Sequence, residues 1–322
     1  MKSISSFFKL IRYRQLLLFT LLFLAVRINI IDIFYANIGL QSSISLPIYF
    51  VLIFTFMCVL AGAYIFNDYC DQGIDEINRL DKNIFINNTI KPKTALKLSW
   101  IFTGIAWAIS LTTAILNLSY CAFIFIFIST FLTYACTVRA KRIFMLKNLI
   151  ITSAPLIAIF MPLIDEYMFL LRDNLTEKYP DEIRIVFHIF LWFALFFTLV
   201  KLIRVIVRDM QDEEGDRAFK VQSLIVRCGV KTTKRTVYVL TSILMAAVIA
   251  FQITYFHINP LSIGGGITIL VLAPLIYFLI EFKKASVVQD YAFLADLVNI
   301  IFISFIFVTF FTRSILVCGA IV

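Results

Sequence analysis

Residues 46–75 read LPIYFVLIFTFMCVLAGAYIFNDYCDQGID, an apolar run that ends in a cluster of aspartates. The apolar part is long enough to cross a bilayer, because about 20 apolar residues in a helix span the hydrocarbon core. Asp68, Asp71 and Asp75 then follow at spacings of three and four residues. This spacing predicts three carboxylates on one face of an α-helix. Since carboxylates are costly near hydrocarbon, their position indicates a function.

The same pattern occurs a second time, in RDMQDEEGD at residues 208–216. Asp209, Asp212 and Asp216 again run i, i+3, i+7 at the end of an apolar segment. Clustered carboxylates repel one another unless a cation lies among them. Mg²⁺ prefers a few carboxylates together with water and substrate phosphate oxygens. Two facing helices of this kind would hold Mg²⁺ ions that bridge to a diphosphate.

The composition predicts an all-α membrane protein. Hydrophobic residues make up 61% of the 322 residues, charged residues 15%, and the mean hydropathy is +0.94. Apolar windows of membrane-spanning length recur about nine times. We expect spans near 16–37, 45–66, 97–117, 118–138, 148–168, 184–203, 236–257, 262–281 and 291–313. They would form one domain, residues 1–322, whose helix bundle surrounds a central cavity open to the cytoplasmic side.

The net charge of +9 is explained by membrane topology rather than by nucleic-acid binding. Cytoplasmic segments of membrane proteins are enriched in Lys and Arg. With the N-terminus inside, 24 of the 29 basic residues fall in the expected cytoplasmic segments. The two longest of these, expected as loops near 67–96 and 204–235, carry the aspartate motifs. We therefore expect a multi-pass protein of the cell (inner) membrane. The scattered Cys and His residues predict no zinc or haem site.

Basic residues accompany both aspartate motifs and would neutralise phosphate charge. They are Arg79 and Lys82 after the first motif, Arg139, Lys141 and Arg142 between the two, and Lys201, Arg204, Arg208 and Arg217 around the second. Alternatively, each motif is a solvated loop in which acids balance bases. That alternative does not explain why two distant segments share one spacing after an apolar span.

With these motifs the chain resembles the UbiA superfamily of intramembrane prenyltransferases. Asn67, Asp68, Asp71 and Asp75 match its first signature, N-D-x-x-D-x-x-x-D. Its second signature is matched within DMQDEEGD, and YACTVRAKRIFMLKN carries Tyr134, Lys141 and Asn148 where the family often has Tyr, Lys and Asn. The chain departs from the family after both motifs, and at the start of the first span, where Arg12, Tyr13, Arg14 and Gln15 replace an Asn.

The resemblance implies Mg²⁺-dependent transfer of a prenyl group from a polyprenyl diphosphate to a lipid or quinone-precursor (aromatic) acceptor. It assigns metal binding to the six aspartates Asp68, Asp71, Asp75, Asp209, Asp212 and Asp216. It assigns contacts with the diphosphate to Asn67, Arg79, Lys141, Arg204 and Arg208. An aromatic face such as that of Tyr134 would stabilise a prenyl cation.

Two other functions are compatible with the motifs. A terpene cyclase of the same superfamily would capture the cation within the prenyl chain and use no external acceptor. An ion-coupled transporter would use the carboxylates as a cation path, although transporters usually place such groups near the bilayer midplane. Four polar residues within spans have two interpretations, which are pairing with other helices or with each other, and lining of a cavity. They are Arg27, Asp32, Asp296 and Asn299.

Overall fold

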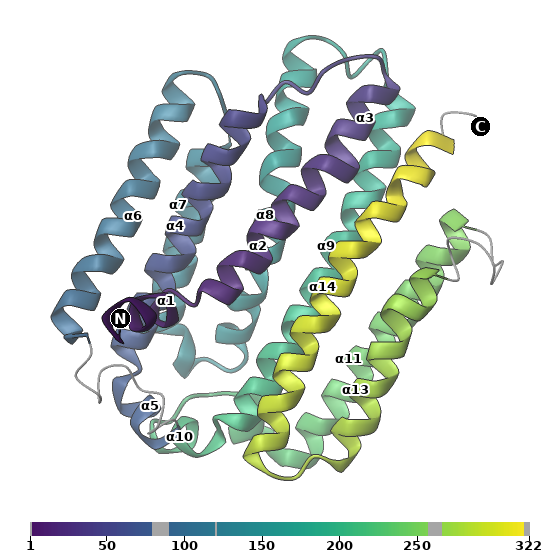
Figure 1. The fold of residues 1–322 in the computed structure, drawn as a ribbon. Helices are drawn as coiled ribbons and strands as arrows, with labels where there is room; N and C mark the ends of the chain where they lie inside the picture. Colours follow the sequence, from purple (N-terminus) through teal and green to yellow (C-terminus); the bar gives the residue numbers. More distant parts are fainter. Residues whose placement is uncertain (1, 79–89, 120, 257–265, 319–322) are drawn as a thin grey trace. The chain divides into compact units, whose positions relative to one another are not determined.

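The computed structural model describes residues 2–78, 90–119, 121–256 and 266–318. No β-strand occurs among them, and the order of elements along the chain is shown in Figure 1. The elements are α1 (Lys2–Leu10), α2 (Tyr13–Val26), η1 (Arg27–Ile31), α3 (Asp32–Asn37), α4 (Leu46–Cys70), α5 (Gln72–Asn78), α6 (Pro92–Ile115), α7 (Ala122–Val138), η2 (Ala140–Arg142), α8 (Leu146–Arg172), α9 (Pro180–Gln211), α10 (Glu213–Ala218), α11 (Leu224–Phe256), η3 (Thr268–Leu272), α13 (Ala273–Lys284) and α14 (Val288–Cys318).

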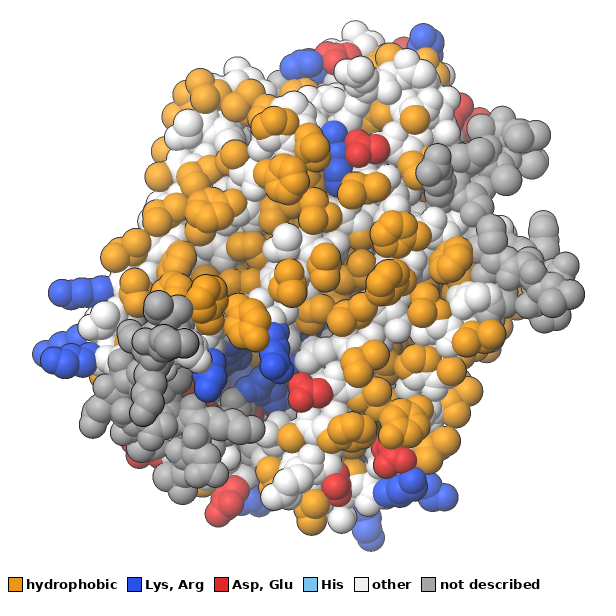
Figure 2. Space-filling view, in the orientation of Figure 1, with side chains coloured by type: hydrophobic (Ala, Val, Ile, Leu, Met, Phe, Trp, Pro, Cys, Tyr) orange, Lys and Arg blue, Asp and Glu red, His pale blue; other side chains and the backbone are white. Residues whose placement is uncertain are grey.

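Within the described residues, seven helices are long and apolar enough to cross a membrane, which confirms the prediction of an all-helical integral membrane protein. They are Tyr13–Asn37, Leu46–Cys70, Pro92–Ile115, Leu146–Arg172, Pro180–Gln211, Leu224–Tyr255 and Val288–Thr312. The fourth and eighth expected spans correspond to shorter helices, α7 and η3–α13. The expected count of nine spans and the side of the membrane on which a cavity opens therefore stay predictions. On the face in Figure 2, hydrophobic side chains are spread over much of the surface, interspersed with backbone and other side chains.

The chain divides into two compact units, whose boundaries fall within α2, α8 and α11, between α3 and α4, and between α9 and α10. Unit 1 comprises Met1–Thr20, Ile44–Asp165 and Asp212–Arg227, and unit 2 comprises Leu21–Ser43, Glu166–Gln211 and Cys228–Val322. Each unit is described by itself below, and the expectation of a single domain stays a prediction.

Unit 1 is built on the mutual packing of α4, α6 and α7. Gly62 of α4 allows α6 to come close, because a Cβ atom there would lie 2.8 Å from Thr103 Oγ1 and 3.0 Å from the main-chain oxygen of Ser99. The Ser99 hydroxyl donates a hydrogen bond of 2.8 Å to the main-chain oxygen of Gly62. The amphipathic helix α1 packs against α4 through Leu10, which is fully buried together with Ile65.

Unit 2 is held by the packing of α9 against α14. The ring centroids of Phe197 and Phe302 lie 4.7 Å apart, and those of Phe196 and Phe305 lie 5.0 Å apart. Such aromatic pairs stabilise by about 0.5–1.5 kcal/mol beyond their buried area. Long apolar helices that expose aromatic faces to each other thus supply the core of this unit.

A buried charged cluster in unit 2 explains two of the polar residues predicted within spans. Arg27 Nε lies 2.8 Å from Asp32 Oδ1, and Arg27 Nη1 donates to Glu166 Oε1 at 3.2 Å. The other Glu166 oxygen accepts from the Tyr35 hydroxyl at 2.8 Å. Arg27 therefore pairs with Glu166 of another helix and with Asp32 of its own span. Asp296 is exposed on α14, and its role stays open.

Candidate functional site

Both aspartate motifs interrupt a helix at their middle aspartate. Helix α4 ends at Cys70, Asp71 has φ −94° and ψ 11°, and α5 begins at the next residue. Asp212 has φ −96° and ψ 14° between α9 and α10. The sequence predicts a single helical face for each motif and loops around them. Instead, each motif joins a long helix to a short one, with its middle residue in the bridge region that active-site residues often adopt.

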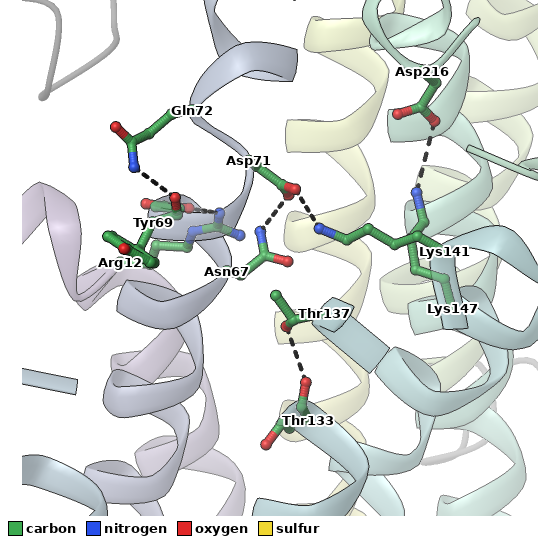
Figure 3. A network of polar contacts seen from close by, with 11 residues as sticks. Arg12, Asn67, Tyr69, Asp71, Gln72, Thr133, Thr137, Lys141, Lys147 and Asp216 are labelled. Atoms are coloured by element: carbon green, nitrogen blue, oxygen red, sulfur yellow. Dashed lines mark hydrogen bonds and ion pairs between the residues drawn. The ribbon is translucent and has the colours of Figure 1, made fainter. Parts of the chain in front are cut away.

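In the first motif, cationic and amide side chains contact the carboxylates (Figure 3). The Lys141 ammonium contacts Asp71, and the Asn67 side-chain amide donates to Asp71 Oδ2 at 2.9 Å. The Arg12 guanidinium contacts Asp68. Because all of these residues belong to unit 1, the predicted grouping of Asn67, Asp68, Asp71 and Lys141 is present within one compact body.

The second motif is tied to the first through the short helices α5 and α10, which lie side by side in unit 1 (Figure 1). The Asn78 side-chain amide donates to the main-chain oxygen of Asp212 at 3.1 Å, and the main-chain N–H of Gly215 donates to Asn78 Oδ1 at 2.8 Å. Lys147 Nζ lies 3.7 Å from Asp216 Oδ2. Asp212 and Asp216 therefore join the body that carries Asp68, Asp71 and Asp75.

The connection between α7 and α8 adds a backbone link to the segment after α10. The main-chain N–H of Gln222 donates to the Lys141 carbonyl at 2.8 Å, and the main-chain N–H of Met145 donates to the Gln222 carbonyl at 3.4 Å. The backbone of Lys141 is therefore held by the second motif's own continuation. Its side chain meanwhile contacts Asp71, so Lys141 connects the first motif with the segment that follows the second.

Three of the predicted site residues lie in unit 2, and a fourth lies outside the described residues. Asp209, Arg204 and Arg208 belong to α9 and thus to unit 2, where Asp209 is buried and the two arginines are half-buried. Arg79 lies outside the described residues. Among the residues that the structure describes, no group of three His, Cys, Asp or Glu side chains is arranged to hold a metal ion. The assignment of all eleven residues to metal and diphosphate stays a prediction.

An aromatic cluster in unit 1 includes Phe66, the residue directly before Asn67. The Tyr134 hydroxyl lies 2.8 Å from Ser99 Oγ and 2.8 Å from Thr103 Oγ1. Its ring centroid is 4.4 Å from that of Phe66 and 5.2 Å from that of Trp100. These contacts fix the orientation of the Tyr134 ring, which the sequence indicates as a face for positive charge.

The sequence prediction does not include Arg12, Asn78 and Lys147 as site residues. Arg12 stands at the position where the chain departs from its family, and Asn78 lies in IDEINR directly after the first motif. Burial acts to lower the pKa of the Arg12 guanidinium, but the charge of Asp68, neighbouring Tyr64 and the hydrogen bond to Asp68 raise it overall. Arg12 therefore stays charged, with its guanidinium 5.1 Å from the centroid of the Tyr64 ring.

The model of the UbiA prenyltransferase family matches residues 33–306, a segment that includes both aspartate motifs and Lys141. The chain belongs to the UbiA prenyltransferase family. A search of curated protein sequences finds no match. Membership places the paired aspartate motifs in a family of enzymes that transfer prenyl groups.

Solved structures of UbiA homologues share the fold. A structure of digeranylgeranylglyceryl phosphate synthase is 20% identical, with a TM-score of 0.57 over 96% of this chain and 99% of that one. A UbiA homologue from Archaeoglobus fulgidus bound to DMAPP and Mg²⁺ is 15% identical, with a TM-score of 0.59 over 95% and 99%. The same homologue bound to GPP and Mg²⁺ is 14% identical, with a TM-score of 0.58 over 95% and 99%.

Proposed function

We propose that this UbiA-family protein transfers a prenyl group from a polyprenyl diphosphate to a lipid or quinone-precursor acceptor and releases diphosphate. The observation that carries the proposal is the α5–α10 contact in unit 1, which brings Asp212 and Asp216 into the same body as Asp68, Asp71 and Lys141. Paired acidic motifs with cations among them suit a metal-bound diphosphate, because each partner balances the charge of the other.

The donor set fits Mg²⁺. Asp68, Asp71, Asp75, Asp209, Asp212 and Asp216 offer hard carboxylate oxygens, the ligands that this ion prefers. Mg²⁺ is usually bound by one or two carboxylates together with substrate phosphates rather than by a closed protein cage. Arg12, Lys141 and Lys147 each contact a different motif carboxylate. Carboxylates that are held apart in this way agree with an ion bound by one or two of them together with substrate phosphates. The UbiA homologues with bound DMAPP or GPP also contain Mg²⁺, which supports the same ion here.

Transfer breaks the bond between C1 of the prenyl group and the diphosphate oxygen, and the electron pair leaves with the diphosphate. A new bond joins C1 to the acceptor atom, which loses its proton. Bound Mg²⁺ would stabilise the negative charge that develops on the leaving group. Lys141 and, within α9, Arg204 and Arg208 would contact the diphosphate and add positive charge. Asn67 would orient Asp71, to which it already donates a hydrogen bond.

The apolar helices would bind the prenyl chain and exclude water from the allylic cation. Tyr134 is held by Ser99 and Thr103, so its ring would meet the cation without reorganisation. The similarity to digeranylgeranylglyceryl phosphate synthase makes a glycerol-phosphate lipid the first acceptor to test, ahead of a naphthoate or a benzoate. We expect the reaction at the cytoplasmic side of the inner membrane.

The test uses purified protein in detergent with radiolabelled geranylgeranyl or farnesyl diphosphate, Mg²⁺ and a panel of acceptors. We expect diphosphate release to require Mg²⁺ and to be abolished in Asp68→Ala and Asp212→Ala. Glu76→Ala is the matched control, since it removes an exposed carboxylate from α5 beside Asp75. Normal turnover in both aspartate variants would overturn the proposal.

Two further outcomes separate the other functions. Formation of a prenyl product without any acceptor would identify a terpene cyclase. Uptake of a solute into proteoliposomes, with no cleavage of the diphosphate, would identify a transporter.

A further inference from the structure

The two short helices that follow the aspartate motifs contact each other through a reciprocal pair of glycines. A Cβ atom at Gly73 of α5 would lie 2.6 Å from Phe219 Cζ, at the end of α10. A Cβ atom at Gly215 of α10 would lie 2.5 Å from Asn78 Nδ2, at the end of α5. Each helix thus presents one glycine to a side chain of the other.

Both glycines lie between the second and third aspartates of a motif. Gly73 separates Asp71 from Asp75, and Gly215 separates Asp212 from Asp216. The closeness of the two helices therefore determines how near the carboxylates of one motif come to those of the other. A side chain at either glycine would displace the side chain that it meets, Phe219 or Asn78.

Apolar burial contributes little to this contact. No residue of α5 is buried, and the Phe219 side chain is 52% exposed. Acidic side chains crowd both helices, with Glu76 on α5 and Glu213 and Glu214 on α10 besides the motif aspartates. Like charges on neighbouring helices repel unless they are paired, as Glu213 is with Arg217 at 2.6 Å. A specific attractive contact must therefore hold the helices together.

Asn78 makes that contact. Its neutral amide donates to the main-chain oxygen of Asp212 at 3.1 Å and accepts from the main-chain N–H of Gly215 at 2.8 Å. Both bonds go to the backbone of the second motif, so they fix its position whatever the motif carboxylates bind. A carboxylate at the same place would lose the donor and add a repelling charge.

We infer that Asn78 is a positioning residue that fixes the second aspartate motif against the first, with Gly73 and Gly215 as the points of close approach, so that both motifs bind one Mg²⁺–diphosphate group. The inference rests on the proposed function. It assigns Asn78 a role that acts through the backbone of Asp212 and Gly215.

The test measures binding of inorganic pyrophosphate by calorimetry across a range of Mg²⁺ concentrations, with melting temperature recorded in parallel. We expect Asn78→Ala to raise the Mg²⁺ concentration for half-maximal binding about tenfold, since two hydrogen bonds are lost. Asn78→Asp keeps the shape but should raise it at least as much. Glu76→Gln, an exposed change on the same helix, should leave it unchanged.

A double-mutant comparison sharpens the result. Alanine at position 215 would displace the Asn78 side chain, so Gly215→Ala should match Asn78→Ala, and the two together should be no worse than either. Gly104→Ala is the control, because no atom lies within 4 Å of a Cβ atom there. Additive effects of the two changes would overturn the inference.

Two other results bear on the inference in different ways. A lower melting temperature with an unshifted Mg²⁺ dependence would show that Asn78 only stabilises the fold, and would overturn its positioning role alone. Failure of the unmodified protein to bind pyrophosphate at any Mg²⁺ concentration would overturn the proposed function, and the inference with it.

Discussion

The ammonium group of Lys141 contacts the carboxylate of Asp71, although 70 positions separate the two residues in the chain. Both side chains are largely buried, at 12% and 15% exposure, so solvent screens this pair less than a surface ion pair. One carboxylate of the first aspartate motif is therefore already paired with a side-chain ammonium group. This arrangement makes opposite predictions for the metal and for the diphosphate.

Lys141→Met should raise the KM for prenyl diphosphate by about ten- to a hundredfold, because a charge-assisted hydrogen bond contributes roughly 1.5–3 kcal/mol. The same change should strengthen binding of Mg²⁺ alone, since the ammonium no longer competes for Asp71. Steady-state kinetics and Mg²⁺ titration check the two effects. Lys93→Met, at an exposed position of α6, is the control. Weaker binding of both ligands would contradict this role.

Arg12→Gln should lower the free energy of unfolding by about 1–3 kcal/mol, because the largely buried carboxylate of Asp68 loses its charged partner. Addition of Mg²⁺ and pyrophosphate should recover part of the loss, since the ligand would satisfy that carboxylate. Thermal unfolding in detergent, with and without ligand, measures both. The exposed Arg14→Gln serves for comparison. If the ligand recovered none of the lost stability, Arg12 would not act in the site.

Gly62→Ala should destabilise unit 1 by about 1–3 kcal/mol, because the added methyl group would press on Thr103 and on the backbone of Ser99. Gly104→Ala, in the neighbouring helix, meets open space and should stabilise by up to about 1 kcal/mol through helix propensity. Melting temperatures of the two variants should therefore move in opposite directions. Equal shifts would mean that α4 and α6 do not pack this closely.

Glu166→Leu should destabilise unit 2 by roughly 3 kcal/mol, because it leaves Arg27, whose side chain is 6% exposed, without one of its charged partners. The Tyr35 hydroxyl and the main-chain N–H of Ser43, which donate to Glu166, also lose their acceptor. Chemical or thermal denaturation measures the loss against Glu177→Leu at an exposed position. A change below about 1 kcal/mol would contradict a stabilising role for this buried cluster.

The aspartate motifs show what a local sequence pattern can and cannot predict. Their spacing predicts metal-binding carboxylates, and the family resemblance adds Lys141, which does contact Asp71. The same spacing predicts an unbroken helix for each motif. Instead, the first motif leaves the helical conformation at Asp71 and the second leaves it at Asp212. Helical periodicity contains no information about where a helix stops when neither Pro nor Gly stands at the break. The turn depends on what the following helix packs against.

Hydrophobic content was enough to predict a helical membrane protein, and the i, i+3, i+7 spacing was enough to predict paired carboxylate motifs, because both properties come from residues close together in the chain. The contacts of Arg12 with Asp68 and of Gly215 with Asn78 join residues 56 and 137 positions apart. Their energies arise only when separate helices pack, since an isolated segment has no partner for these groups. Which cation meets which carboxylate, and what holds the two motifs together, was therefore decided by tertiary packing.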